Sequence, residues 1–294
     1  MADDHWDPAL EDLNEKGTGL FGPKSFMDYL EEIGEDRRDY RTPAEISIDT
    51  YIDLSPKLRD HDTMVLRLGF APEGRGTGFA LVKVDNALDD FFIQEREIPI
   101  TDEYILDFSR EGEDIDLLNR QTRDMLEAYR QLPRFSESSY VNLALSTGIF
   151  SQALDFDCDI IGTAPTTISS SYSFDFQPHS RLEHVLHHDR GQVEIDAIII
   201  TRKQGKRVAV VIEAKSGSPR ALAKHKLFYP YLAVKNLIPD DIHALIPVYV
   251  RAQTFDDSIT YDIYEGSVNS QNDNQPSMDE LTITNCYRYS LHIV

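Results

Sequence analysis

The chain has 294 residues, which is enough for one large domain or for two of ordinary size. Its formal net charge of −22 opposes general attraction to a polyanion, so contacts with nucleic acid have to come from local positive clusters. No apolar run approaches the roughly 20 residues that cross a bilayer, and the acidic start lacks the pattern of a signal peptide. We therefore expect a cytoplasmic protein that does not enter a membrane.

The N-terminal half is predicted to contain helices followed by short strands. Residues 1–20 are rich in Asp and Glu and lack periodicity, which indicates a disordered acidic tail. The next segment has apolar residues at helical spacing, and Ser25 is placed to cap its start. Segments 63–71, 78–86 and 91–100 are short and rich in β-forming residues, so we expect a small sheet here.

Two helices are predicted in the middle of the chain. Residues 113–132 form an amphipathic pattern that Pro133 ends, and residues 138–157 form a second helix that bends near Gly148. The first helix and the residues after it carry a set of positive charges: Arg120, Arg123, Arg130 and Arg134. A solvated helix face is the favoured interpretation of this set, and a surface that contacts phosphates is the alternative.

A boundary is expected within the Ser/Thr-rich segment 162–180, which contains two prolines. We therefore divide the chain into a tail (1–20), an N-terminal α+β region (21–162) and a C-terminal domain (163–294).

The C-terminal domain is predicted to begin with a short helix over residues 180–191, which Gly191 ends. Ser180 and Glu183 fit the S-x-x-E capping box, in which the glutamate has only a structural role. The alternative, that Glu183 is a further acidic residue of an active site, depends on the segment that comes next.

The segment 196–215 reads DAIIITRKQGKRVAVVIEAK and predicts a β-hairpin with its turn between Gln204 and Gly205. Residues whose numbers sum to 409 then face each other, so Asp196 lies opposite Glu213. Two opposed carboxylates repel each other, and a divalent cation such as Mg²⁺ between them removes the repulsion.

Lys215 shares the face of Glu213, because strand side chains alternate with period 2. It is placed to orient or deprotonate a water, or to stabilise charge on a phosphate. The alternative is a hairpin whose polar residues face solvent. The Val and Ile residues on both faces favour a central strand instead.

Positive charge is concentrated near this hairpin. The predicted nucleic-acid contacts are Arg202, Lys203, Lys206 and Arg207 at the hairpin tip, and Arg220, Lys224 and Lys226 after it. We expect these side chains to gather around the acidic pair and to contact a phosphate backbone. The helix that follows is predicted to begin at Ser218 and to bend or end at Pro230.

Asp196, followed after sixteen residues by Glu213-Ala214-Lys215 at the end of a hydrophobic strand, resembles the signature of the PD-(D/E)xK nuclease superfamily. The proline of that signature is absent here, since Ile195 precedes the aspartate. The resemblance covers about residues 180–265. It implies an α/β (α+β) fold of the restriction-endonuclease type, a mixed central sheet flanked by helices, with the N-terminal helix-and-strand region packed against it.

The resemblance also implies a function: Mg²⁺-dependent hydrolysis of phosphodiester bonds in DNA by a type II restriction-endonuclease-like enzyme. Asp196, Glu213 and the carbonyl of Ala214 would hold Mg²⁺, for which Mn²⁺ could substitute. Lys215 would act beside the metal, and Glu183 corresponds to a further acid that many members supply from an upstream helix. Double-stranded DNA, a second copy of the chain and a DNA methyltransferase are the expected partners.

Two alternatives stay open. One is a catalytically inert nuclease-fold module that binds nucleic acid or protein, and the other is an acidic structural or regulatory protein that never contacts DNA. Aspartates outnumber glutamates and arginines outnumber lysines, a balance that resembles the proteins of salt-adapted archaea. At molar salt the Debye length falls to about 3 Å, which weakens the repulsion between this halophilic type of surface and DNA.

Overall fold

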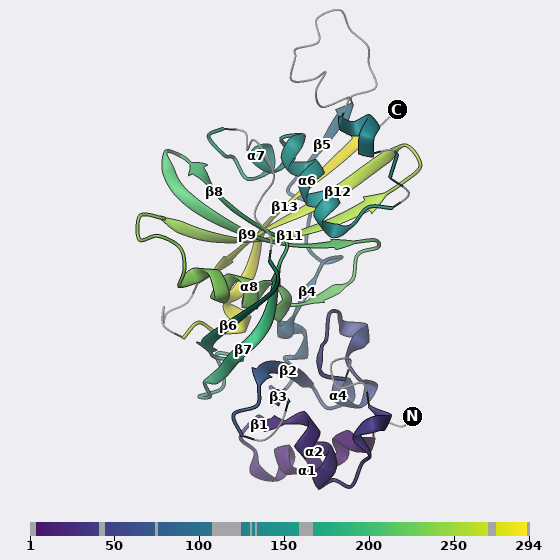
Figure 1. Ribbon diagram of the computed structural model, residues 1–294, viewed down its shortest axis with the longest axis vertical. Coiled ribbons are helices and arrows are strands. Elements are labelled where there is room, and N and C mark those ends of the chain that lie inside the picture. The colour runs from purple at the N-terminus through teal and green to yellow at the C-terminus, as the bar shows by residue number, and fades with distance from the viewer. Residues whose placement is uncertain are drawn as a thin grey trace, which may run out of the picture.

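The computed structural model describes residues 4–40, 45–73, 76–107, 125–129, 131–132, 134–158, 167–269 and 275–292. The protein is mixed α/β, as predicted, and consists of helices packed on three β-sheets. The N-terminal region lies at one end of an elongated molecule and the largest sheet at the other (Figure 1). Among the described residues, no helix has the length and apolar character that a membrane crossing requires.

The first sheet has five strands in the order β1-β3-β2-β7-β6. Its strands are β1 (Leu20–Ser25), β2 (Thr63–Phe70), β3 (Thr77–Lys83), β6 (Thr167–Phe176) and β7 (Leu186–Ile195). This sheet combines strands from both sides of the predicted boundary, which therefore does not separate two independent sheets.

Strands β2 and β7 approach closely at Gly69, which pairs with Asp189. A Cβ atom at Gly69 would lie 2.2 Å from the Asp189 carbonyl oxygen, and Gly69 has a positive φ of 76°. Only glycine satisfies both conditions, so this residue permits the junction between the N-terminal strands and the rest of the chain.

The N-terminal helices are α1 (Asp7–Lys16), α2 (Phe26–Glu32) and α4 (Pro56–Asp60). The prediction of a disordered tail is wrong for the described residues from Asp4 onward. Trp6, Leu10 and Leu13 are buried in the core at helical spacing, although the acidic residues Asp7, Glu11 and Asp12 lie between them in the sequence. Ser25 caps α2 as predicted, since its side chain accepts a hydrogen bond from the Asp28 N–H.

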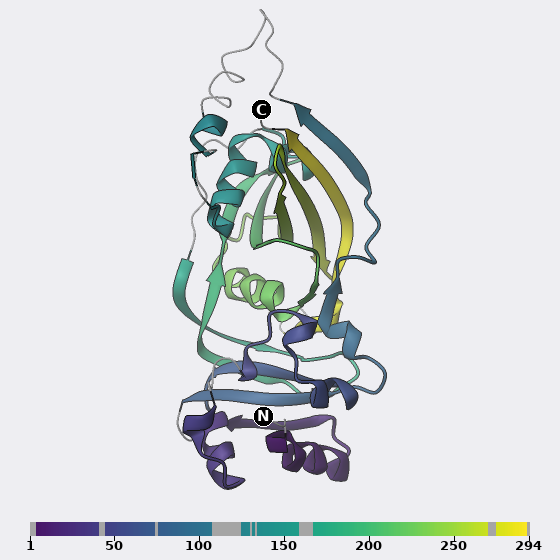
Figure 2. The same cartoon turned by 90° about the vertical axis from the view of Figure 1, so that its right-hand side faces the viewer.

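The largest sheet has six strands in the order β5-β13-β12-β11-β9-β8, and Figure 2 shows how strongly it curves. Its strands are β5 (Asp102–Asp107), β8 (Ala197–Lys203), β9 (Lys206–Ser216), β11 (Ala244–Thr254), β12 (Ser258–Val268) and β13 (Leu281–His292). A third sheet pairs β4 (Phe92–Gln94) with β10 (Ala221–Ala223).

The predicted hairpin is confirmed. Strands β8 and β9 pair antiparallel from Ala197↔Ile212 to Lys203↔Lys206, which is the register that sums to 409. Gln204 and Gly205 both have positive φ at the turn, of 54° and 76°, as a tight hairpin of this type requires.

Helices cover both faces of the large sheet. Helix α8 (His225–Lys235) connects β9 to its parallel neighbour β11 and packs on the face that carries Val211 and Tyr249. Helices α6 (Glu137–Ser146) and α7 (Ile149–Ala153) are on the other face, with Val210 and Ile212. The break between α6 and α7 is at Gly148, as predicted. The predicted helix over 113–132, with Arg120, Arg123 and Arg130, lies mostly outside the described residues.

Two helix predictions in the second half are wrong. The segment expected as a helix over 180–191 is a loop followed by strand β7, whose residues alternate between buried and exposed. The predicted helix start at Ser218 is replaced by strand β10, and α8 begins only at His225. Pro230 lies inside α8 without ending it.

Candidate active site

Asp196 is the one residue between β7 and β8, at the point where the chain leaves the five-stranded sheet and enters the six-stranded sheet. Its Oδ2 accepts a hydrogen bond of 2.7 Å from the N–H of Ala214. The carboxylate is thereby attached to strand β9, next to Glu213. Burial raises the pKa of Asp196, and the nearby Glu194 adds to the rise.

Glu213 and Lys215 lie on the same face of β9, as predicted, and form an ion pair of 2.8 Å between Nζ and Oε1. Glu213 is buried, with 4% of its surface exposed. Burial raises its pKa to about 7 and Asp196 adds to the rise, while Lys215 opposes it. Burial lowers the pKa of Lys215, but its acidic neighbours together raise it above the ordinary value, so this ammonium stays charged at neutral pH.

Glu137, which the sequence analysis did not single out, also belongs to this cluster. It is the first residue of α6, and its Oε2 lies 3.4 Å from Lys215 Nζ. Burial raises its pKa, Lys215 opposes this, and Asp196 adds to the rise. Three carboxylates therefore surround one ammonium group, which leaves an excess of negative charge.

Glu183, predicted as a possible further acid, does not lie with this cluster. It is exposed in the loop before β7, where it lines an open depression with Lys83 and Arg181. Glu137 from α6, and not Glu183, lies beside Lys215. No sequence signal identifies it, since 76 residues separate it from Glu213 (213 − 137).

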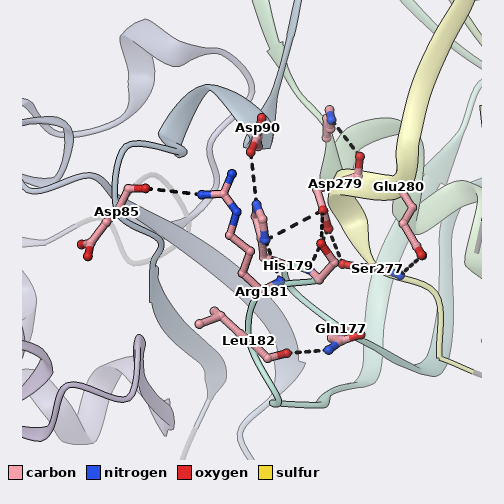
Figure 3. Close-up of polar contacts among 11 residues, drawn as sticks. Asp85, Asp90, Gln177, His179, Arg181, Leu182, Ser277, Asp279 and Glu280 are labelled. Carbon is pink, nitrogen blue, oxygen red and sulfur yellow. Dashed lines mark hydrogen bonds and ion pairs between the residues drawn. The ribbon is translucent and has the colours of Figure 1, made fainter.

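The loop that carries Glu183 is fixed by a buried histidine, as Figure 3 shows. His179 Nε2 lies 3.2 Å from Asp90 Oδ2, and the N–H of Arg181 donates to His179 Nδ1 over 3.1 Å. Ser180 donates to Asp279 through both its N–H and its hydroxyl. These bonds attach residues 179–181 to Asp90 and Asp279, and the segment forms a loop.

A buried ion pair supports the end of β9. Arg251 on β11 donates to Glu95 from Nε at 3.0 Å and from Nη2 at 2.6 Å, and both side chains are almost fully buried. The Tyr249 hydroxyl donates to the same carboxylate. Arg251 Nη1 also donates to the carbonyl of Ser216 over 3.2 Å, so this network holds the backbone directly after Lys215.

The predicted nucleic-acid contacts are divided between two places. Lys226 on α8 reaches the site: its charge opposes the raised pKa of both Asp196 and Glu213, and it forms an ion pair with Asp49. The hairpin tip does not reach it, because seven residues of extended strand separate Lys206 from Glu213, about 23 Å.

The charges at the tip are engaged with the protein itself. Lys203 forms an ion pair of 2.7 Å with Glu265, Arg207 pairs with Asp241, and Arg202 donates to the carbonyl of Gly205. Lys224 is partly buried near Asp279, with a pKa that burial lowers, and Arg220 is exposed. The expected gathering of all seven charges around the acids is therefore wrong.

The donors of the acidic pair fit a hard divalent cation. Asp196 accepts the Ala214 N–H through Oδ2 and Glu213 contacts Lys215 through Oε1, so among the described residues Asp196 Oδ1 and Glu213 Oε2 have no hydrogen-bond donor. No group of three or more His, Cys, Asp and Glu side chains is arranged around a metal position in that part of the chain. Mg²⁺ often uses only one or two carboxylates and completes its shell with waters and substrate phosphate, so the pair is sufficient for it.

Comparison with known proteins gives one match. The model of a family described as a domain of unknown function, DUF6997, matches residues 106–279, which include Glu137, the hairpin and α8. No curated protein and no solved structure matches the chain.

Proposed function

The chain belongs to the DUF6997 family, and from the geometry of its acidic pair we propose that it is a Mg²⁺-dependent endonuclease that hydrolyses phosphodiester bonds of DNA. One observation carries the proposal: Asp196 is bonded to the β9 backbone beside Glu213, and Lys215 contacts Glu213 on the same face. The three residues that resemble the nuclease signature are thus neighbours in space as well as in pattern.

The arrangement of the large sheet supports a restriction-endonuclease-like fold. A mixed sheet carries the hairpin, α8 connects β9 to the parallel strand β11, and helices lie on both faces. The five-stranded sheet adds an N-terminal region that shares strand β7 with the site. Such a region is suited to contact substrate on either side of the cleavage point.

Asp196, Glu213 and the carbonyl of Ala214 would hold the metal. A bound Mg²⁺ would supply a Lewis acid for the phosphate and a water of lowered pKa. Burial raises the pKa of both carboxylates, so ionising them costs free energy unless a cation lies nearby. A cation bound between them would offset that cost.

Lys215 would stabilise negative charge rather than accept a proton. Its acidic neighbours keep it protonated at neutral pH, so its ammonium can donate hydrogen bonds to a phosphate oxygen but cannot deprotonate water. Glu137 holds the same ammonium from the other side and would fix its direction. Lys226 would add a second positive charge on the α8 side of the site.

Double-stranded DNA as substrate, a homodimer and a DNA methyltransferase partner are proposals that rest on the resemblance alone. The inert nuclease-fold module is the second candidate function. Calorimetric titration distinguishes it, since binding of Mg²⁺ or Mn²⁺ that Asp196→Asn abolishes is expected only of the enzyme.

The test of the proposed activity is incubation of supercoiled plasmid with Mg²⁺ at high salt. We expect nicking or linearisation by the wild type, strong loss with Asp196→Asn and Lys215→Ala, and no loss with Glu183→Gln, which removes an acid outside the cluster. Equal cleavage by all four proteins would identify a contaminating nuclease and overturn the assignment.

A further inference from the structure

A cavity of about 120 Å³ adjoins the acidic pair, between β7 and α8. Glu213 forms part of its wall, and the opposite wall includes His225 and Tyr229 of α8. His188 and Gln192 of β7 and Arg67 of β2 line it as well. The cavity is therefore continuous with the proposed catalytic site but is not used by the chemistry described above.

His225 indicates that a ligand belongs in this cavity. Its ring is 7% exposed, and its Nδ1 has no hydrogen-bond partner among the described residues. A buried polar nitrogen without a partner destabilises a folded protein, so such an atom in a cavity wall points to a partner supplied from outside.

His188 forms a rigid part of the same wall. Its Nδ1 lies 3.2 Å from the Tyr172 carbonyl oxygen, which fixes that nitrogen as the donor. The ring stacks on Phe174 with 4.6 Å between centroids and an interplanar angle of 5°. It also packs on Gly191, where a Cβ atom would lie 2.3 Å from the imidazole. The ring cannot turn away, so this wall is preformed.

The cavity wall offers both hydrogen-bond donors and hydrogen-bond acceptors. Burial lowers the pKa of His188 to about 4 and that of His225 to about 3, so both rings are uncharged at neutral pH and each has one donor and one acceptor. The side-chain amide of Gln192 adds a donor group and an acceptor group, and the guanidinium of Arg67 adds donors. The charges in the wall are balanced, since Arg67 and Lys226 are opposite in sign to Glu194 and Glu213. The mixture of donors and acceptors therefore suits the edge of a neutral heterocycle, and the rings of Tyr229 and the histidines offer flat surfaces for its faces.

The volume limits the ligand to one ring. A cavity of about 150 Å³ accommodates benzene, so a space of about 120 Å³ that opens to solvent on one side suits a single six-membered ring. A bicyclic purine would not fit without rearrangement of a wall that His188 and Gly191 hold fixed.

We propose that this cavity receives one unstacked pyrimidine base of the nucleic-acid substrate, with the phosphate of that nucleotide at Asp196 and Glu213. The proposal rests on the proposed nuclease function and adds a preference to it, namely cleavage beside pyrimidines. Enzymes that take a base out of the stack act most readily where stacking is already weak. Distorted or locally unpaired stretches of double-stranded DNA are therefore the preferred points of cleavage.

Binding without cleavage tests the cavity independently of the proposed activity. The full-length protein, kept in chelator, is titrated with dCMP, dTMP, dAMP and inorganic phosphate by calorimetry. We expect the pyrimidine nucleotides to bind at least about tenfold more tightly than dAMP or phosphate. His225→Phe, which fills the cavity, should abolish this difference, whereas Glu183→Gln should leave it unchanged. Equal binding of dCMP and dAMP, or pyrimidine binding that survives His225→Phe, would overturn the proposal.

A second binding experiment tests whether the cavity accepts a base that belongs to a DNA strand, and not only a free nucleotide. An oligodeoxyadenosine that contains one thymidine should bind more tightly than the all-adenosine strand, and failure of this difference overturns the proposal. His225→Gln keeps a donor and an acceptor and should retain part of the preference, which distinguishes loss of the pocket from loss of the fold. Cleavage of plasmid without pyrimidine preference would refute the pocket alone, and pyrimidine binding without cleavage would refute the nuclease function alone.

Discussion

The two ends of one hairpin carry similar charges in very different surroundings. At the base, Glu213 is buried and the half-buried Lys215 and Asp196 lie beside it, and the pKa values of Glu213 and Lys215 depart from the ordinary range. At the tip, Lys206 and Arg207 are at the surface, and Arg207 pairs with the exposed Asp241. The sequence has more charged residues at the tip, yet charge–charge interactions are stronger at the base, because burial there excludes water. The four predictions below test this contrast.

Loss of Glu95 should have the largest effect, on stability. Glu95→Ala leaves Arg251 as an unpaired buried charge behind Lys215, so we expect the free energy of unfolding to fall by about 3–5 kcal/mol. Denaturant titration followed by circular dichroism measures the change. Glu95→Gln, which removes the charge but keeps a hydrogen-bond acceptor, should lose less, and equal losses would show that the remaining acceptor contributes nothing there.

Removal of the half-buried Lys215 should have the next largest effect, on activity. Lys215→Ala deletes the ammonium that would stabilise charge on the phosphate, so the rate of plasmid cleavage should fall about 10²–10³-fold. The matched control is Lys206→Ala on the same strand, for which we expect little change. Similar losses in both variants would mean that the tip contributes as much as the base.

The pH dependence of stability should report on Glu213. Because burial raises its pKa from 4.5 to about 7, the folded protein binds this proton more tightly than the unfolded chain. The free energy of unfolding of the metal-free protein should therefore fall by about 3 kcal/mol as pH rises from about 4.5 to about 7, and level off above that.

Denaturant titrations across this pH range measure the slope. Glu213→Gln should flatten it, and saturating Mg²⁺ should also flatten it, since a cation holds the carboxylate ionised at lower pH. A slope that persists in Glu213→Gln would assign the effect to other groups.

The smallest effect is expected at the tip. Arg207→Ala removes an exposed ion pair with Asp241, so the free energy of unfolding should change by only about 0–1 kcal/mol. Thermal unfolding at low and high salt measures it, and any change should shrink at high salt. A larger loss would indicate that the tip has a structural role beyond this pair.

The sequence predicts the local part of the site well. Alternation and the Gln204-Gly205 turn are sufficient to set the register of β8 and β9, because a hairpin is determined by neighbouring residues. The common face of Glu213 and Lys215 follows from the same alternation.

Contacts in the site between residues far apart in sequence cannot be predicted from strand alternation or turn residues. Glu137, Glu95 and Arg251 are distant in sequence and meet only because α6 and β11 pack beside β9. The error at β7 has a similar cause, since the burial of His188 becomes intelligible only with Phe174 and Gly191 beside it. The order of residues 4–16 depends on a core that Phe26 and Phe79 complete around Trp6.

The position of Asp196 couples the two large sheets mechanically. It is a single residue between strands that belong to different sheets, whereas Glu213 lies wholly within one of them. A small rotation of one sheet against the other would change the separation of the two carboxylates and hence their affinity for a cation. A molecule that binds the N-terminal sheet would thereby change the spacing of the acidic pair from a distance.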